Sequence, residues 1–178
     1  MEEIKKGGYM NKSLYLKQIP NTSLNSYISG LEALNLKTDL YDSIDWHRLG
    51  VLYSHKQNDL ITTFKSNTIL GDAGIIKQYI ILANKQSFVA KPTRAIVDLI
   101  FSIINSSDIT YKKRRLNMLR GDIYNLFPDD LERKNIASLL IKIIKATNSK
   151  ELQDFFKEEM PKEFFNYTYK GEQYEYCE

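Results

Sequence analysis

The chain has 178 residues, of which 43% are hydrophobic and 26% charged, as expected for a protein that folds around its own core. Its net charge of +3 is too small to make nucleic-acid binding the default expectation for the whole surface. The single cysteine, Cys177, leaves no pair for an internal disulfide and favours a reducing, cytoplasmic location. No apolar stretch is long enough to predict a membrane span.

The first residues suggest a translation signal. Lys5–Gly8 precede a second methionine, Met10, and common low-GC codons for these four residues contain the purine string of a bacterial ribosome-binding site. We predict that translation starts at Met10 and that residues 1–9 are an upstream leader, with a short disordered tail as the alternative. The many Ile, Lys, Asn and Tyr residues fit the same low-GC bacterial or phage origin.

Apolar residues in the first half recur mostly at helical spacing. Residues 24–34 predict an amphipathic helix, and residues 38–52 predict one or two further short helices. The β-branched residues of 59–70 favour an extended or irregular passage, which the glycines of 71–74 interrupt. Residues 75–82 fit a buried helix or a strand equally, because short apolar runs do not distinguish the two.

The second half has clearer helical patterns. Residues 92–104, with Pro92 in the first turn, predict a central buried helix. Residues 109–126 predict a helix that opens after a cap at Asp108, has Ile109 on its packed side and stops at Phe127-Pro128.

Two further helices follow. A cap at Asp129 or Asp130 precedes a predicted helix over residues 131–144, with Leu131 on its inner face. Ser149 begins the last predicted helix, which Met160-Pro161 ends.

These patterns predict a mainly α, single-domain helical bundle with a small β-hairpin or irregular segment around residues 59–90. The expected organisation is a leader over residues 1–9, a helical domain over 10–163 and an aromatic, acidic C-terminal tail over 164–178.

Charge is distributed unevenly. Residues 91–120 contain seven basic and two acidic residues, a net charge of +5, whereas residues 151–178 have a net charge of −5. The basic segment is predicted to form a helix, a short turn and a second helix. This arrangement resembles a DNA-binding helix-turn-helix, although any two helices joined by a short turn have the same form. The residues expected to contact nucleic acid or an acidic partner surface are Lys112, Lys113, Arg114, Arg115, Asn117 and Arg120.

The tail concentrates aromatic side chains, which are costly to leave in water and are enriched at protein interfaces. Either these side chains fold back over the helical body or they dock on a partner, and alternating tyrosines would also suit strand addition. The residues expected to contact a protein partner are Phe164, Phe165, Tyr167, Tyr169, Tyr174 and Tyr176.

Catalytic and metal signatures are weak. His47 and His55, with Asp45 and Asp59, match no metalloenzyme spacing, and residues 71–74 lack the features of a phosphate-binding loop. We therefore predict a non-catalytic cytoplasmic protein without cofactor or metal. It is expected to be a small accessory subunit or inhibitor/immunity-type protein of a bacterial or phage complex that binds another protein, with its basic helix facing either DNA or RNA held in the complex or an acidic partner surface. The alternative is a helical DNA- or RNA-binding regulator that uses the basic helix 109–126. Partner identity and oligomeric state stay open.

Overall fold

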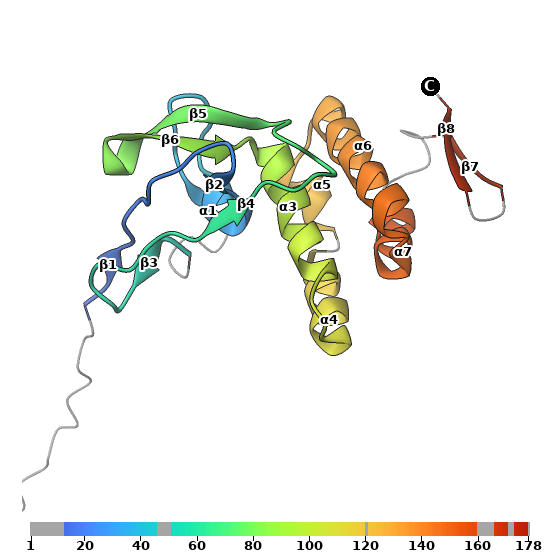
Figure 1. Ribbon diagram of the computed structural model, residues 1–178, viewed down its shortest axis with the longest axis horizontal. Helices are drawn as coiled ribbons and strands as arrows, with labels where there is room; N and C mark the ends of the chain where they lie inside the picture. The colour runs from blue at the N-terminus through green and yellow to red at the C-terminus, as the bar shows by residue number, and fades with distance from the viewer. Residues whose placement is uncertain (1–12, 46–50, 120, 160–165, 171–172, 178) are drawn as a thin grey trace, which may run out of the picture.

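The computed structural model describes residues 13–45, 51–119, 121–159, 166–170 and 173–177. The described residues include both long helices and a four-stranded sheet, so the protein is a mixed α/β fold. The predicted mainly α helical bundle is therefore wrong. Figure 1 shows strands β1 to β6 on the left, helices α4 to α7 to their right, and α3 between them.

Strands form three sheets. A four-stranded sheet has the order β4-β2-β6-β5, and β1-β3 and β7-β8 are antiparallel pairs. In the four-stranded sheet only β2 and β6 run parallel. The strands are β1 (Tyr15–Leu16), β2 (Ser26–Ile28), β3 (Tyr53–Ser54), β4 (Thr63–Lys65), β5 (Ile75–Ile80), β6 (Lys85–Ala90), β7 (Asn166–Lys170) and β8 (Gln173–Cys177).

The helices are α1 (Gly30–Asn35), the 3-10 turn η1 (Ile81–Ala83), α3 (Pro92–Ile104), α4 (Ile109–Leu119), α5 (Asp122–Leu126), α6 (Asp130–Thr147) and α7 (Lys150–Glu159). Helix α3 contacts α1 and β6 on the sheet side and α4 and α6 on the helical side. The prediction of a central buried helix over residues 92–104 is confirmed, because eight side chains of α3 are buried.

The predicted helix over residues 24–34 is replaced by β2 followed by the short α1. Gly30 separates them with a φ of +60°, and a Cβ there would lie 2.9 Å from the Phe64 ring. A continuous helix cannot pass through this left-handed residue, and β2 gains hydrogen-bonded partners on both sides. Of the predicted short helices over residues 38–52, residues 46–50 lie outside the described ranges.

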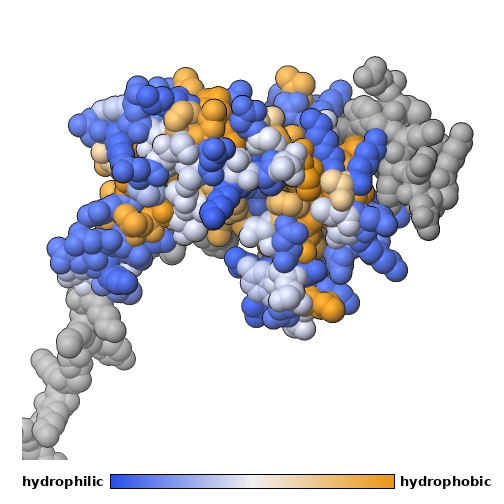
Figure 2. Space-filling view, viewed as in Figure 1, coloured by the Kyte–Doolittle hydropathy of each residue, from blue (hydrophilic) through white to orange (hydrophobic). Residues whose placement is uncertain are grey.

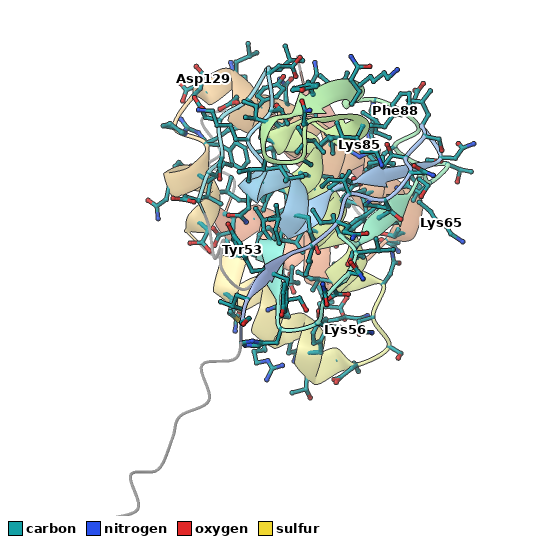
Figure 3. All side chains as sticks on the ribbon, turned by 90° about the vertical axis from the view of Figure 1, so that its left-hand side faces the viewer. Tyr53, Lys56, Lys65, Lys85, Phe88 and Asp129 are labelled. Carbon is teal, nitrogen blue, oxygen red and sulfur yellow. The ribbon has the colours of Figure 1, made fainter. Side chains whose placement is uncertain are left out.

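Strands β4, β5 and β6 lie within residues 59–90, the region for which the sequence predicts a small β-hairpin or an irregular segment. The β5-β6 hairpin turns through η1 and Asn84, which has a φ of +49°. At its outer end Lys85 donates from Nζ to the Ile19 carbonyl at 2.9 Å, and the Phe88 N–H donates to Thr22 Oγ1 at 2.8 Å. Figure 3 labels Lys85 and Phe88 at this corner.

The predicted helix over residues 109–126 is two helices, since Gly121 with a φ of +77° separates α4 from α5. The Gly121 N–H donates to the buried Glu159 carboxylate at 2.6 Å, which ties this break to the end of α7. Asp129 caps α6 as predicted, accepting from the Leu131 and Glu132 N–H groups. Leu131 itself is 66% exposed, so its predicted place on the inner face is wrong.

Candidate functional site

Helix α4 holds most of the basic side chains that the sequence singles out. It is capped as predicted, because Asp108 Oδ1 accepts from the Tyr111 N–H at 2.9 Å. Leu116 and Leu119 are buried, and they fix the rotation of α4 against the helices it contacts. The opposite side of the helix therefore faces solvent.

An open groove of about 610 Å³ follows this outward side. The α4 groove is lined by Ile109, Thr110, Lys113, Arg114, Asn117 and Met118. Ile109 is 60% exposed and Met118 is 55% exposed, at opposite ends of a helix whose middle is cationic. Figure 2 shows apolar surface beside hydrophilic surface at the end of the molecule that α4 forms.

Sequence reasoning missed the apolar part of this site. Ile109 was expected to pack inward, but it stands in the first turn of α4 with most of its side chain in solvent. Met118 follows Leu116 by two residues, which places it on the far side of the helix from the packed leucines. That offset was the available signal for Met118, whereas nothing in the spacing marks Ile109 as exposed.

Arg94, one of the seven basic residues of the 91–120 segment, is not at the surface. It is fully buried, and its Nε donates to Asp98 Oδ1 at 2.8 Å. Its Nη1 donates to the carbonyls of Gly71 and Ala73 at 3.1 and 2.7 Å. One cation and one anion of the predicted patch thus neutralise each other in the interior.

The rest of this buried network comes from β2 and from Ser29, which follows it. Arg94 Nη2 donates to the Tyr27 hydroxyl at 2.8 Å, and that hydroxyl donates to Asp98 Oδ2 at 2.9 Å. The Ser29 hydroxyl donates to the same carboxylate oxygen at 2.7 Å. Burial, with a smaller contribution from the Asp98 carboxylate, raises the pKa of Tyr27 far above its ordinary value. These bonds join β2, α3 and the 71–74 loop into one closed structural unit.

Other cations of the segment are drawn away from the groove. The Arg115 guanidinium lies 5.7 Å from the centre of the Tyr111 ring, and both side chains are half-buried. Lys112 is also half-buried and Arg120 lies outside the described residues. The predicted contact residues that share the groove are therefore Lys113, Arg114 and Asn117.

An acidic helix end lies near the start of α4. The pKa of Glu151 is lowered, mainly by hydrogen bonds from its own backbone N–H and from the Ser149 hydroxyl. The positive charges of Lys112 and Lys113 add smaller lowering contributions, so these lysines lie within electrostatic range of Glu151. The opposite charges of the two predicted segments therefore meet in part within one molecule.

The labelled lysines on the sheet side of the molecule do not form a second basic patch. Lys56, Lys65 and Lys85 come from three separate segments and lie well apart in Figure 3. Lys85 is also engaged by backbone carbonyls. These three lysines form no cluster that could follow a phosphate backbone.

The other chemical candidates have structural roles. The 71–74 loop presents carbonyl oxygens to Arg94 instead of N–H groups to an anion. His55 is exposed, and His47 lies outside the described residues. Among the residues that are described, no group of three or more His, Cys, Asp or Glu side chains could hold a metal ion.

The tail forms a β-hairpin rather than a single extended strand. Its register pairs Tyr167 with Tyr176 and Tyr169 with Tyr174. Phe164 and Phe165 lie outside the described residues. Protein contact through the tail stays a prediction.

No protein-family model matches the chain, and searches of curated proteins and of solved structures return no significant match. In the part of the chain that the structure describes, none of the helices combines the length and apolar character needed to cross a bilayer.

Proposed function

We propose that this protein is a non-catalytic protein-binding protein, an accessory subunit or inhibitor/immunity-type component, that contacts its partner through the α4 groove. The observation that carries the proposal is the exposure of Ile109 and Met118 on either side of Lys113 and Arg114. Large apolar side chains in water stabilise a complex when a protein surface covers them, and they gain little from phosphates. A cytoplasmic location and a cofactor-free mode of action belong to the same proposal.

The number of available cations favours protein over nucleic acid. Proteins that bind duplex DNA through its backbone commonly neutralise about six to ten phosphates. Two cations, Lys113 and Arg114, line the groove, while Arg94 is buried against Asp98. An acidic protein surface needs fewer charges, because apolar burial supplies much of the binding free energy.

A DNA- or RNA-binding regulator is the second candidate function. It is favoured by Asn117, which shares the groove with Lys113 and Arg114 and could meet a base edge while they meet phosphates. The two candidates differ in what Ile109 and Met118 contribute, since a protein partner would bury both, whereas a nucleic acid held through its phosphates would leave them exposed.

The test is affinity purification of tagged wild-type protein from its host, with and without nuclease. Two variants accompany it: Ile109→Ser with Met118→Ser, and a control, Lys142→Glu with Lys145→Glu, two exposed lysines of α6. We expect a stoichiometric protein that survives nuclease, is lost from the groove variant and is kept by the control. Recovery that depends on nucleic acid and ignores the apolar substitutions would contradict the proposal.

A further inference from the structure

We infer that the α4 groove binds an acidic amphipathic helix of the partner protein, and that the helix contacts it through an apolar, an acidic and an apolar residue at successive four-residue steps. This inference rests on the proposed function and names the chemistry of the partner.

The lining residues form two parallel rows on α4. Ile109, Lys113 and Asn117 make one row, and Thr110, Arg114 and Met118 make the other. Residues four apart on a helix form a ridge, and the channel between two such ridges accepts the corresponding ridge of another helix. The groove is thus shaped as the receiving half of a helix–helix contact with no described helix of this chain in it.

Spacing along the groove defines the ridge that fits. Ile109 and Met118 are nine residues apart, which separates them by about 13.5 Å along the α4 axis at 1.5 Å per residue. Nine residues also carry Met118 a half-turn around α4 from Ile109, so the two side chains flank the channel from opposite rows. Two residues eight apart on a partner helix are separated by about 12 Å, so a ridge lying in the channel would contact Ile109 from one row at one end and Met118 from the other row at the other end. Lys113 and Arg114 lie midway between Ile109 and Met118 along α4. The middle residue of the partner ridge, four residues from each apolar end, would place a carboxylate there.

The described helices of a second copy of the chain are a poor fit for the groove. Within the described helices, no stretch carries an apolar, an acidic and an apolar residue at successive four-residue steps. Nucleic acid carries its negative charge on the phosphates, whereas its apolar groups, the base faces and thymine methyls, lie inside the helix and its grooves, so it does not offer charge and apolar surface in the alternating order of the α4 groove. The favoured occupant is therefore an acidic helix of a different protein.

The test uses a synthetic helical peptide of about sixteen residues, since shorter helices are marginal in water. Its ridge is Leu, Glu and Leu at four-residue steps; a control peptide of the same composition has these residues on different faces. Binding to the full-length protein is measured by fluorescence anisotropy at about 0.15 M salt, with a labelled DNA duplex as a second probe. We expect the ridge peptide to bind at least about tenfold more tightly than the control peptide.

Charge exchange makes the test independent of folding. Lys113→Glu with Arg114→Glu should weaken the ridge peptide at least about tenfold and create binding of a peptide with Lys in place of Glu. Ile109→Ser with Met118→Ser should weaken both peptides. Equal binding of ridge and control peptides, no gain on charge exchange, or preference for the duplex would overturn the inference.

Failure here and failure of the proposed function have different signatures. If the host protein is still captured through Ile109 and Met118 while the ridge peptide does not bind, the proposed function stands and the helix inference falls. If no protein is captured through these residues, both fall.

Discussion

Helices α3 and α4 follow one another and each carries an arginine that the basic segment includes, Arg94 and Arg114, yet the two charges lie in opposite environments. Arg94 of α3 is fully buried and closes a network with Asp98, Tyr27 and two loop carbonyls. Arg114 of α4 is exposed in an open groove. A count of charges along the sequence does not distinguish these two arginines. Whether an arginine stabilises the fold or can contact a partner depends on whether its side chain is buried or exposed in the folded protein.

The difference arises from what each helix packs against. Helix α3 contacts α1, β6, α4 and α6, so it lies in the interior, where a charge must be paired. Helix α4 contacts α3 and α5 on one side and leaves the other side open. Substitutions on α3 should therefore change stability, and those on the α4 groove should change binding.

The largest expected effect is on α3. Arg94→Met would leave the Asp98 carboxylate buried without its cation, and should lower the free energy of unfolding by about 3–5 kcal/mol. The matched Arg114→Met on α4 should change it by less than about 0.5 kcal/mol. Urea unfolding of both variants measures the contrast, and similar losses from the two would show that the comparison is mistaken.

The loop that receives Arg94 gives the next effect. Gly74 has a φ of +78°, and a Cβ there would lie 2.9 Å from Arg94 Cβ, whereas the space at Gly71, with a φ of +56°, is open. Gly74→Ala should destabilise by about 2–3 kcal/mol and Gly71→Ala by about 1 kcal/mol. Thermal unfolding of both isolates the steric contact, and equal losses would argue against a rigid Arg94 environment.

An effect of alkaline pH should report the same network. Because burial raises the pKa of Tyr27, the native state keeps this proton at a pH where the unfolded chain, with a pKa of about 10, loses it. The stability that Tyr27 contributes is present below about pH 10 and is lost as pH rises toward the native pKa. Unfolding free energy should therefore fall more steeply between about pH 9 and 11 in the wild type than in Tyr27→Phe. Parallel profiles would mean that Tyr27 is not shielded from solvent.

The smallest effect on stability should come from α4. Lys113→Glu with Arg114→Glu alters exposed side chains, so the free energy of unfolding should change by less than about 0.5 kcal/mol while partner binding is lost. Lys142→Glu with Lys145→Glu is the matched control, with unchanged stability and binding. A large loss of stability in the α4 variant would show that Lys113 and Arg114 stabilise the fold, as Arg94 does.

Helices whose patterns are local could be predicted from the sequence. Pro92 and the apolar run to Ile104 specify α3, and Asp129 caps α6, because each signal lies within or next to the helix that it specifies. The sheet could not be predicted in the same way. Strand β2 looks helical from its apolar spacing, and its identity depends on β4 and β6, which lie far away in sequence.

The site was predictable in part. Lys113, Arg114 and Asn117 share the outward face of α4, as their spacing indicates. The burial of Arg94 was not visible, because it depends on Tyr27 and on the carbonyls of the 71–74 loop. The spacing of Ile109 from Leu116 predicts the packed side, but Ile109 is the first residue of α4 and is exposed there, which its spacing does not indicate.

The most direct test of the α4 site is photo-crosslinking in the host from a photoreactive residue placed at Asn117, compared with one placed at Lys142 on α6; both positions are exposed. The account predicts one dominant protein adduct from position 117 that persists after nuclease treatment and is absent from position 142. Adducts with nucleic acid, or the same adducts from both positions, would contradict it.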